Sequence, residues 1–309
     1  MKVWLKRKLK NSENVDPRLR QILDEANAVI YGKADELQLA LTCFLADGHL
    51  LVEDTPGVGK TTFVSCLAQL LGLKMNRIQF TNDLLPGDVL GSSIFNEVDR
   101  KFHFHPGAVF AEMVLGDELN RANPKTQSAF LQAMEERRVT IDGHSHTLPP
   151  PFLIVCTQNP QTQIGTYPLP ESQLDRFMLR LSLGYPDTES ETQMLAAENP
   201  RLRIMKLKPV LNAFDFMELQ KKSQLTTVAL PVIKYVQSLL AHSRTSGSGL
   251  SPRAGILILQ AARSWAFLDG RDFVLPEDIQ TLAPFVFDHR LPTSSQINST
   301  QLLKSVPVP

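Results

Sequence analysis

The sequence predicts an α/β protein with a doubly wound, mainly parallel five-stranded sheet, followed by a smaller α-helical domain. From about residue 15 to 185, short apolar runs alternate with helical patterns. Each run is apolar almost throughout, as in parallel strands that helices cover on both faces. Beyond Gly184-Tyr185-Pro186-Asp187 the strand pattern fades and helical patterns take over. We therefore expect a core domain at residues 1–187, with a basic N-terminal extension at 1–13, and a helical domain at 188–309 that ends in a tail.

The individual elements follow this pattern in order along the chain. The expected strands are His49–Val52, Met75–Phe80, Met113–Gly116, Phe152–Thr157 and Phe177–Leu183. Two stretches of the core predict β-hairpins, one at Ser92–Pro106 and one at Val139–Leu148, where Asp142-Gly143 is a strong turn signal. The clearest helices of the second domain are expected at Pro231–His242 and Pro252–Leu268.

The composition is that of a globular protein and narrows the classes of partner. Of the 309 residues, 43% are hydrophobic and 21% charged, and 32 basic residues balance 32 acidic ones. Zero net charge gives no overall field for holding nucleic acid or an anionic membrane, so no nucleic acid is expected as a partner, although a local basic face stays open.

Location is predicted from hydropathy and cysteine content. No apolar run reaches the roughly 18–20 residues that span a bilayer, so no transmembrane segment is expected. The basic start of the chain is not followed by the apolar segment of a secretory signal. The three cysteines, Cys43, Cys66 and Cys156, lie in apolar surroundings and indicate buried free thiols in a reducing compartment. We therefore expect a cytoplasmic protein.

The stretch Val52–Thr62, VEDTPGVGKTT, predicts a phosphate-binding loop. It lies between an apolar run and a helical run, so that backbone N–H groups and a helix N-terminus converge on an anion. Gly57 and Gly59 let the backbone turn and approach phosphate oxygens. Lys60 supplies a positive charge, and the Thr61 hydroxyl can ligate Mg²⁺. The usual pattern has glycine where this chain has Asp54, and Gly-Lys-Thr alone also recurs by chance. The residues expected to bind the nucleotide are Asp54, Thr55, Pro56, Gly57, Val58, Gly59, Lys60, Thr61 and Thr62.

A second motif, Glu112–Glu118 or EMVLGDE, is an apolar strand that ends in two adjacent carboxylates. A nucleotide hydrolase needs such a pair beside its phosphate loop. Asp117 can hold Mg²⁺ at the bound nucleotide, and Glu118 can orient the attacking water or accept its proton. The alternative is a strand that runs into a charged surface loop. Because the pair occurs together with the lysine loop, we favour a magnesium-dependent site that hydrolyses a nucleotide.

From about Val29 to Arg290 the chain resembles the AAA+ ATPases, and among them the MoxR family. The resemblance rests on four segments in order: VEDTPGVGKTT, GDELNRANPKTQSAFLQAMEERRVTIDG, TQNPQTQIGTYPLPESQLDRF and LSPRA. It implies an ATP-binding core with hairpin insertions, a helical lid, Mg²⁺ as cofactor, and a homo-oligomeric ring that is expected to be a hexamer. It also implies chaperone-like remodelling or maturation of protein clients, commonly with von Willebrand factor A-domain proteins as partners.

The resemblance gives roles to further residues that are expected to act in catalysis with Glu118. Asn159 resembles the sensor that hydrogen-bonds the γ-phosphate or the attacking water, although a polar residue before Pro160 is also a common turn residue. Arg176 resembles the arginine finger that enters the neighbouring subunit's site, and an ion pair with Asp175 is the alternative.

Arg253 resembles the second sensor of AAA+ lids and has a physical argument of its own. Ser251-Pro252 predicts the N-cap and first position of a helix, so Arg253 lies in the first turn. A cation there opposes the helix dipole, which is understandable if an anion lies opposite. A solvated surface arginine is the alternative.

Each predicted hairpin carries two alternating histidines, His103 with His105 and His144 with His146. Four imidazoles suggest zinc, but an i, i+2 pair shows only that both side chains share one strand face. No cysteine or carboxylate partner is evident in the sequence. The resemblance places both hairpins at the centre of the ring, so contact with a client or partner is favoured over metal binding.

Two other functions remain as alternatives. A nucleic-acid motor or loader is the first, because hairpin insertions also occur in AAA+ proteins that work on DNA. The zero net charge argues against it. A low-turnover ATP-dependent switch is the second, and the presence of Glu118 and Arg176 argues against that.

Overall fold

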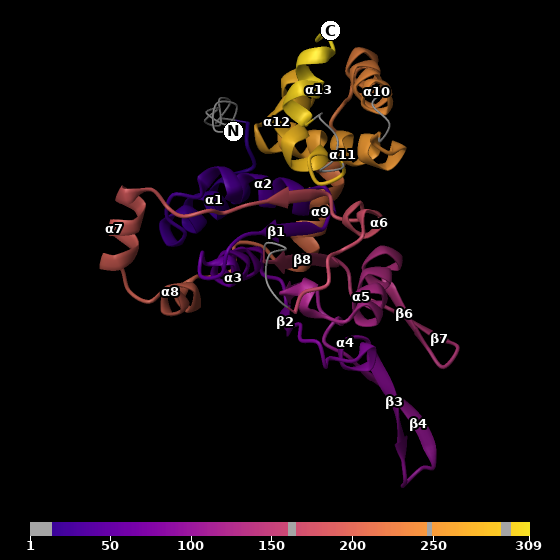
Figure 1. Cartoon of the computed structure of the whole chain (residues 1–309). Helices are drawn as coiled ribbons and strands as arrows, with labels where there is room; N and C mark the ends of the chain where they lie inside the picture. The colour runs from indigo at the N-terminus through magenta and orange to yellow at the C-terminus, as the bar shows by residue number, and fades with distance from the viewer. Residues whose placement is uncertain (1–13, 160–164, 246–248, 292–297) are drawn as a thin grey trace. The chain divides into compact units, whose positions relative to one another are not determined.

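The structure, a computed structural model, describes residues 14–159, 165–245, 249–291 and 298–309 (Figure 1). The chain forms two compact units that alternate along the sequence. One comprises Leu51–Arg176 and Ser182–Ala213, and the other comprises Met1–Leu50, Phe177–Leu181 and Phe214–Pro309. The domain boundary near residue 187 stays a prediction, and the basic extension at 1–13 lies outside the described residues.

The predicted parallel sheet is confirmed. Its five strands run in the order β2-β5-β8-β1-β9. Their bounds are β1 (Leu50–Glu53), β2 (Met75–Gln79), β5 (Met113–Asp117), β8 (Leu153–Gln158) and β9 (Leu179–Leu181). Strand β5 pairs in parallel with β2 on one side and with β8 on the other. Parallel neighbours end at the same edge of a sheet, which brings the residues at their carboxyl ends together.

The strands differ in burial, and one expectation about them is wrong. Strands β5 and β8 are buried along their whole length, as their apolar sequences predict. Strand β2 lies at the edge of the sheet, and its side chains Asn76, Arg77 and Gln79 are exposed. The prediction that helices cover every strand on both faces therefore fails for β2, because exposed side chains lie on both faces of this strand.

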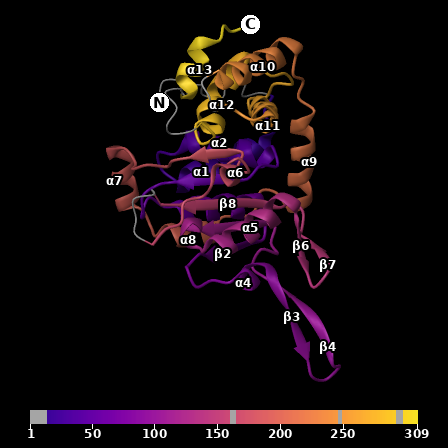
Figure 2. The same ribbon diagram turned by 45° about the vertical axis from the view of Figure 1, so that its right-hand side comes forward.

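Both predicted hairpins are present. Strands β3 (Gly91–Asn96) and β4 (Lys101–Pro106) form one, and β6 (Arg138–Ile141) and β7 (His144–Thr147) form the other. Asp142 and Gly143 have φ angles of 50° and 78°, the positive values that a tight two-residue hairpin turn requires. Figures 1 and 2 show both hairpins projecting from the part of their unit that also carries α4 (Pro86–Leu90) and α5 (Pro124–Glu136).

The remaining helical segments of this unit are α3 (Lys60–Leu71), a 3₁₀ turn η1 (Leu119–Arg121), α6 (Glu171–Leu174), α7 (Thr188–Ala196) and α8 (Pro200–Lys206). Helix α3 ends at Gly72, whose φ is 66°. A Cβ atom there would lie 2.1 Å from the carbonyl oxygen of Leu211, so only glycine fits. Helix α5 starts after Asn123, whose side chain accepts a hydrogen bond from the backbone N–H of Thr126.

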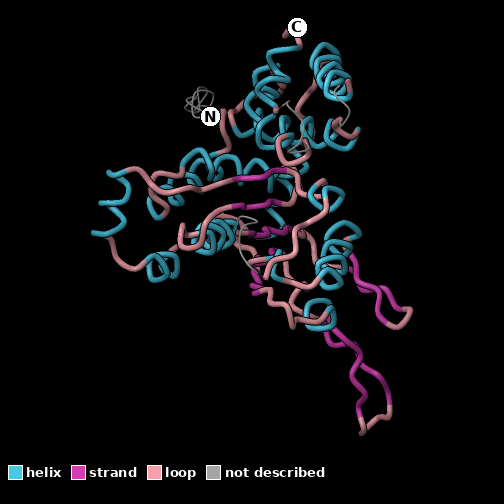
Figure 3. Tube along the Cα trace, viewed as in Figure 1, coloured by secondary structure: helices cyan, strands magenta, loops and turns pink. Residues whose placement is uncertain are grey.

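The described residues of the other unit are mainly helical, as Figure 3 shows for residues 214–309. The helices are α1 (Pro17–Val29), α2 (Ala34–Leu45), α9 (Ala213–Gln224), α10 (Leu230–Arg244), α11 (Pro252–Leu268), α12 (Pro276–Phe287) and α13 (Ser299–Ser305). The core of this unit includes Phe44, Phe216 and Phe287, which are fully buried. The helices predicted at 231–242 and 252–268 are confirmed as α10 and α11. In the described part of the chain, no helix is long and apolar enough to cross a membrane.

Candidate active site

The loop between β1 and α3 has the backbone that the sequence predicts for a phosphate cradle. Gly57 and Gly59 both have φ angles of 88°, a region that residues with a side chain rarely adopt. A Cβ atom at either position would meet no atom within 4 Å, so the backbone conformation requires glycine and the space beside it is open. Helix α3 starts at Lys60 directly after Gly59, and its first backbone N–H groups face the loop, as in sites that bind anions.

The Lys60 ammonium lies inside this loop. Its Nζ donates hydrogen bonds to the carbonyl oxygens of Asp54 at 2.6 Å and Thr55 at 3.1 Å, and to Oδ1 of Asn159 at 3.2 Å. Burial lowers the pKa of Lys60, and the nearby carboxylates of Asp54, Asp117 and Glu118 oppose that effect. The amine is held by neutral oxygens that phosphate oxygens can replace.

Asp54, which stands where the usual loop has glycine, uses its carboxylate within the protein. Oδ1 accepts a hydrogen bond from the N–H of Thr55 at 2.9 Å. Oδ2 accepts from the Ser182 hydroxyl at 3.1 Å and from the Gly184 N–H at 2.5 Å. The side chain therefore ties the loop to the segment after β9. Any contact of Asp54 with a nucleotide would come from its backbone.

Asp117 ends β5 and lies between three polar neighbours. Its Oδ1 accepts a hydrogen bond from the Thr157 hydroxyl on β8 at 2.5 Å. Its Oδ2 lies 3.5 Å from the Thr61 hydroxyl at the start of α3, and 2.7 Å from Nη2 of Arg77 on β2. The carboxylate thus faces the loop with one oxygen, as a residue that holds a metal ion beside Thr61 requires.

Glu118, the next residue, has a left-handed backbone with a φ of 57°. Such a conformation is uncommon for a residue other than glycine and often occurs at functional sites. The backbone N–H donates to the Thr157 hydroxyl at 2.9 Å. Of the two carboxylate oxygens, Oε1 accepts from Asn159 at 3.0 Å, and Oε2 accepts from Gln79 at 3.1 Å and pairs with Arg121 at 3.0 Å.

These contacts bring together residues from both predicted motifs and the predicted sensor Asn159. Lys60, Thr61, Asp117, Glu118 and Asn159 form one connected cluster. Asn159 is central, because its amide bonds both the Lys60 ammonium and the Glu118 carboxylate. Pro56, Val58 and Thr62 lie in the loop and the first turn of α3.

Four residues that contact this cluster had no predicted role: Arg77, Gln79, Arg121 and Thr157. A signal for two of them was present. Strand β2 reads MNRIQ, and Arg77 and Gln79 alternate in a run that was interpreted as apolar. Alternating polar residues on one strand share a face, so they mark where a strand meets a charged neighbour. Thr157 gave no such signal, because a threonine in a buried strand is common.

The two arginines predicted to act with the site lie elsewhere in the chain. Arg176 follows α6, and its Nε pairs with Oε2 of Glu135 on α5 at 2.9 Å. Arg253 lies in the first turn of α11, where the Ser251 hydroxyl accepts a hydrogen bond from the N–H of Ala254 at 3.2 Å. The predicted N-cap is therefore confirmed. Arg253 belongs to the other compact unit.

Two of the four hairpin histidines contact side chains of the hairpins. His103 pairs with Asp99 of its own hairpin at 2.5 Å. His146 stacks on Phe104 of the other hairpin, with ring centroids 3.8 Å apart. Within the described ranges, no group of three or more His, Cys, Asp or Glu side chains is arranged to hold a metal ion.

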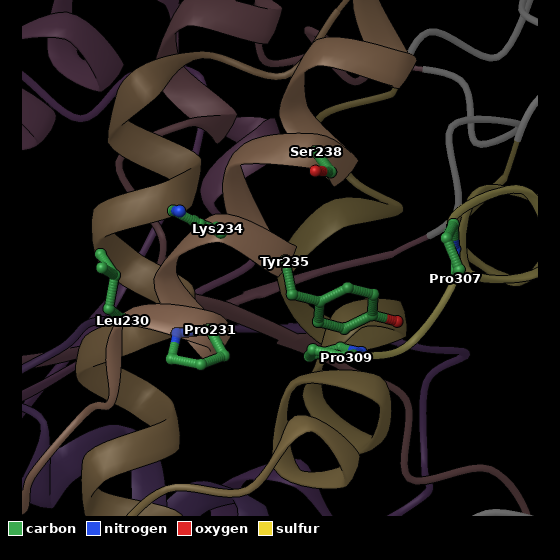
Figure 4. Close-up of a pocket in the computed structure, with 7 residues that line it drawn as sticks. All are labelled: Leu230, Pro231, Lys234, Tyr235, Ser238, Pro307 and Pro309. Atoms are coloured by element: carbon green, nitrogen blue, oxygen red, sulfur yellow. The ribbon is translucent and has the colours of Figure 1, made fainter.

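A pocket in the other unit is separate in sequence from these residues. It is lined by α10 residues, among them Lys234 and Tyr235, and by Pro307 and Pro309 near the end of the chain (Figure 4). None of the residues predicted to bind a nucleotide lines it.

Comparisons with known proteins agree with this geometry. Residues 49–179 match the family described as ATPase family associated with various cellular activities (AAA), and residues 239–305 match the AAA lid domain. The chain is 37% identical to chaperone MoxR1 of Mycobacterium tuberculosis over 88% of this chain and 75% of that protein. The chain belongs to the MoxR family of AAA+ ATPases. As a member of this family it binds nucleotide and hydrolyses ATP.

Two further similarities extend over almost the whole of this MoxR-type ATPase. It is 45% identical to the uncharacterized protein YeaC of Bacillus subtilis (strain 168), over 90% of this chain and 88% of that protein. It also superposes on the crystal structure of a proposed ATPase from Cytophaga hutchinsonii with a TM-score of 0.84. That structure is 34% identical, and the match covers 94% of this chain and 95% of that one.

The residues present fit a nucleotide with its metal ion. The space beside Gly57 and Gly59 is open, and the buried Thr55 hydroxyl has no hydrogen-bond partner among the described residues. Lys60 is held by exchangeable carbonyl oxygens. Thr61 and Asp117 present the hydroxyl and carboxylate oxygens that Mg²⁺ prefers.

Proposed function

We propose that this MoxR-type ATPase is magnesium-dependent, works as a homo-oligomeric ring, expected to be a hexamer, and uses ATP hydrolysis to remodel or mature protein partners. The observation that carries the proposal is the cluster of Lys60, Asp117, Glu118 and Asn159 at the carboxyl ends of β1, β5 and β8. ATP hydrolysis needs a cation at the phosphates, a carboxylate for the metal and a second carboxylate for water, and the cluster supplies all three.

Each residue of the cluster has a role that follows from its contacts. Lys60 exchanges the carbonyl oxygens of the loop for the β- and γ-phosphates, and Thr61 and Asp117 hold Mg²⁺. When bound there, Mg²⁺ would supply positive charge to the phosphates. Glu118 orients the attacking water and accepts its proton. Asn159, bonded to both Lys60 and Glu118, positions the carboxylate relative to the γ-phosphate.

Two arginines that do not belong to the cluster are proposed to contact the γ-phosphate. Arg176 acts as a finger in the neighbouring subunit's site, and its ion pair with Glu135 holds it when no neighbour is present. Arg253 acts as the second sensor: a cation in the first turn of α11 lies against the helix dipole, an arrangement that an anion at this place would stabilise. Loss of these contacts after hydrolysis lets lid and neighbour move, and that motion is the output.

The exposed side chains of the β3–β4 hairpin favour proteins as the clients of this ATPase. The β3–β4 hairpin exposes large apolar side chains, with Val98 95% and Phe102 71% exposed, and Ile94 and Phe95 about half exposed. Exposed apolar residues of this size on one short hairpin are typical of surfaces that bind polypeptide. One relative is named a chaperone. Proteins with a von Willebrand factor A-domain are the proposed partners. A cytoplasmic location accords with three cysteines that are all free and buried.

The test of the ring is ATP turnover per protomer over a wide range of protein concentration. A site completed by a neighbour gives a rate that rises steeply with concentration and then levels. Glu118→Gln and Arg176→Ala subunits are then mixed. The first variant supplies Arg176 to its neighbour, and the second supplies a site with an intact Glu118. Turnover that returns on mixing supports a finger acting in trans.

The matched control is Arg138→Ala, which removes an exposed arginine that pairs with Glu136. Arg138→Ala subunits should hydrolyse ATP without being mixed with another variant. A rate that stays flat on dilution, with no recovery on mixing, would contradict the ring mechanism. ATP binding without turnover at any protein concentration would favour the alternative of a low-turnover ATP-dependent switch.

A further inference from the structure

Arg77 contacts the Asp117 carboxylate from the edge strand β2. Its Nη2 lies 2.7 Å from Oδ2 of Asp117 and also donates a hydrogen bond to Oε1 of Gln79 at 2.8 Å. The Arg77 side chain is 46% exposed, whereas that of Asp117 is only 10% exposed. The guanidinium therefore covers a nearly buried carboxylate from the solvent side.

The register of the sheet explains this contact. Strands β2 and β5 are parallel, with Arg77 opposite Leu115 and Gln79 opposite Asp117. Side chains two residues apart on a strand share a face, so Arg77, Gln79 and Asp117 lie on the same face. The long Arg77 side chain reaches along the strand to the carboxylate at the end of β5. The edge position of β2 leaves room for this, because among the described strands only β5 pairs with it.

The contacted oxygen is the one that the metal site needs. Oδ1 of Asp117 is occupied by the Thr157 hydroxyl, and Oδ2 is the oxygen that lies between Thr61 and Arg77. In the proposed function Thr61 and Asp117 hold Mg²⁺ together. A guanidinium on that oxygen competes with a divalent cation directly and repels it.

The neighbouring carboxylate is neutralised in the same way. Glu118 pairs with Arg121 at 3.0 Å, so each of the two adjacent carboxylates has an arginine partner. A free divalent cation therefore meets no uncompensated negative charge at this pair. A metal ion that arrives on ATP differs, because the phosphates bring both further oxygen ligands and negative charge.

We propose that Arg77 is an internal counter-ion that occupies the metal-binding oxygen of Asp117 in the nucleotide-free chain and gives it up when the metal ion arrives with ATP. The inference rests on the proposed role of Asp117 as the carboxylate that holds the metal ion. Arg77 is thus a positioning residue. It makes metal binding depend on nucleotide, and it disfavours the binding of Mg²⁺ without ATP.

The experiment measures binding of Mn²⁺, a paramagnetic substitute for Mg²⁺, to the nucleotide-free full-length chain by electron paramagnetic resonance. Arg77→Met keeps an unbranched, flexible stem and removes the guanidinium group with its charge. We expect Mn²⁺ to bind this variant about tenfold more tightly than the unsubstituted chain, the size of effect expected for loss of a partly exposed charged hydrogen bond. Arg77→Lys, which keeps a charge without the planar fork, should lie between them.

Lys74→Met is the matched control. Lys74 directly precedes β2 and is exposed. Its substitution by methionine removes one positive charge from the same edge of the sheet. It should leave Mn²⁺ affinity within about twofold of the unsubstituted chain, because an exposed charge away from the carboxylate is screened. If Lys74→Met tightens Mn²⁺ binding as much as Arg77→Met does, the tighter binding comes from the lower net positive charge and not from loss of the Arg77 contact. The proposal is then overturned.

Asp117→Asn separates this proposal from the role of Asp117 itself. Mn²⁺ binding in the presence of ATP should weaken in this variant if Asp117 holds the metal ion. Weakened binding in Asp117→Asn together with unchanged Mn²⁺ affinity in both Arg77 variants would overturn only the role of Arg77. Unchanged binding in Asp117→Asn would overturn the metal site on which the inference rests. Far-ultraviolet circular dichroism of each variant checks folding, and Arg77→Lys carries the test should Arg77→Met fail to fold.

Discussion

The carboxylate pair is contacted from two sides that differ in burial and charge. On the β8 side, Thr157 is fully buried and Asn159 is 2% exposed, and both are neutral. On the β2 side, Arg77 and Gln79 are exposed, and one of them is charged. Each carboxylate gives one oxygen to each side: Asp117 to Thr157 and Arg77, and Glu118 to Asn159 and Gln79.

This difference separates two tasks within one site. Buried neutral groups hold a carboxylate in place without cancelling its charge, and water cannot replace them. Exposed groups are exchangeable, because water or an arriving ligand can take their place at little cost. The β8 side therefore fixes the geometry of the pair, and the β2 side adjusts its charge. The predictions below test that division, from the largest expected effect to the smallest.

The largest effect is expected where both sides meet, at Glu118 itself. Glu118→Gln keeps the shape of the side chain and removes the carboxylate that accepts a proton from water. We expect ATP turnover to fall by about 10²–10⁴-fold, the usual contribution of a general base, with ATP affinity nearly unchanged. Turnover is measured by phosphate release, and affinity by titration with a fluorescent ATP analogue. Unchanged turnover would show that another group activates the water.

An intermediate effect is expected on the buried side, at Thr157. Thr157→Val is nearly isosteric and removes the hydroxyl that donates to Asp117 and accepts from the Glu118 N–H. Both partners are then left without this bond, at a cost of about 1–3 kcal/mol in the free energy of unfolding. Equilibrium urea unfolding measures the change. We also expect lower turnover, because the Glu118 backbone loses the bond that supports its left-handed conformation.

Thr157→Ser is the control, since it keeps the hydroxyl and removes only a methyl group. Loss of a buried methyl costs about 0.5–1.5 kcal/mol and leaves the hydrogen bonds in place. The serine variant should therefore keep its turnover even where it loses some stability. Equal losses of turnover in Thr157→Val and Thr157→Ser would contradict the importance of the hydroxyl and point to packing.

The division between the two sides also explains what the sequence could predict. The sheet, both hairpins and the helices α10 and α11 follow from apolar periodicity and turn residues, which act locally. The strand, loop and helix around Lys60 were predictable for the same reason. The strand order was not, because pairing between distant strands depends on packing rather than on local pattern.

The roles of Arg77 and Gln79 depend on that order. Only when β2 is known to pair with β5 at the sheet edge does an arginine on β2 become a partner of Asp117. Asp54 is a similar case, since its partners Ser182 and Gly184 are far away in sequence. The sequence could show that this loop departs from the usual glycine, whereas only the fold shows that the carboxylate braces the loop.

The smallest effect is expected on the exposed side, at Gln79. Gln79→Leu removes the hydrogen bond to Glu118 Oε2 at 3.1 Å and the hydrogen bond that Gln79 accepts from Arg77. Both bonds involve a charged group, but they are exposed, and water can replace them, so we expect turnover to change by no more than about tenfold. Asn76→Leu, an exposed residue on the opposite face of β2, is the control and should change turnover less. Gln79→Leu could instead lower turnover as far as Glu118→Gln does. The exposed side would then fix the geometry of the carboxylate as firmly as the buried side. In that case the assignment of separate tasks to β8 and β2 is wrong.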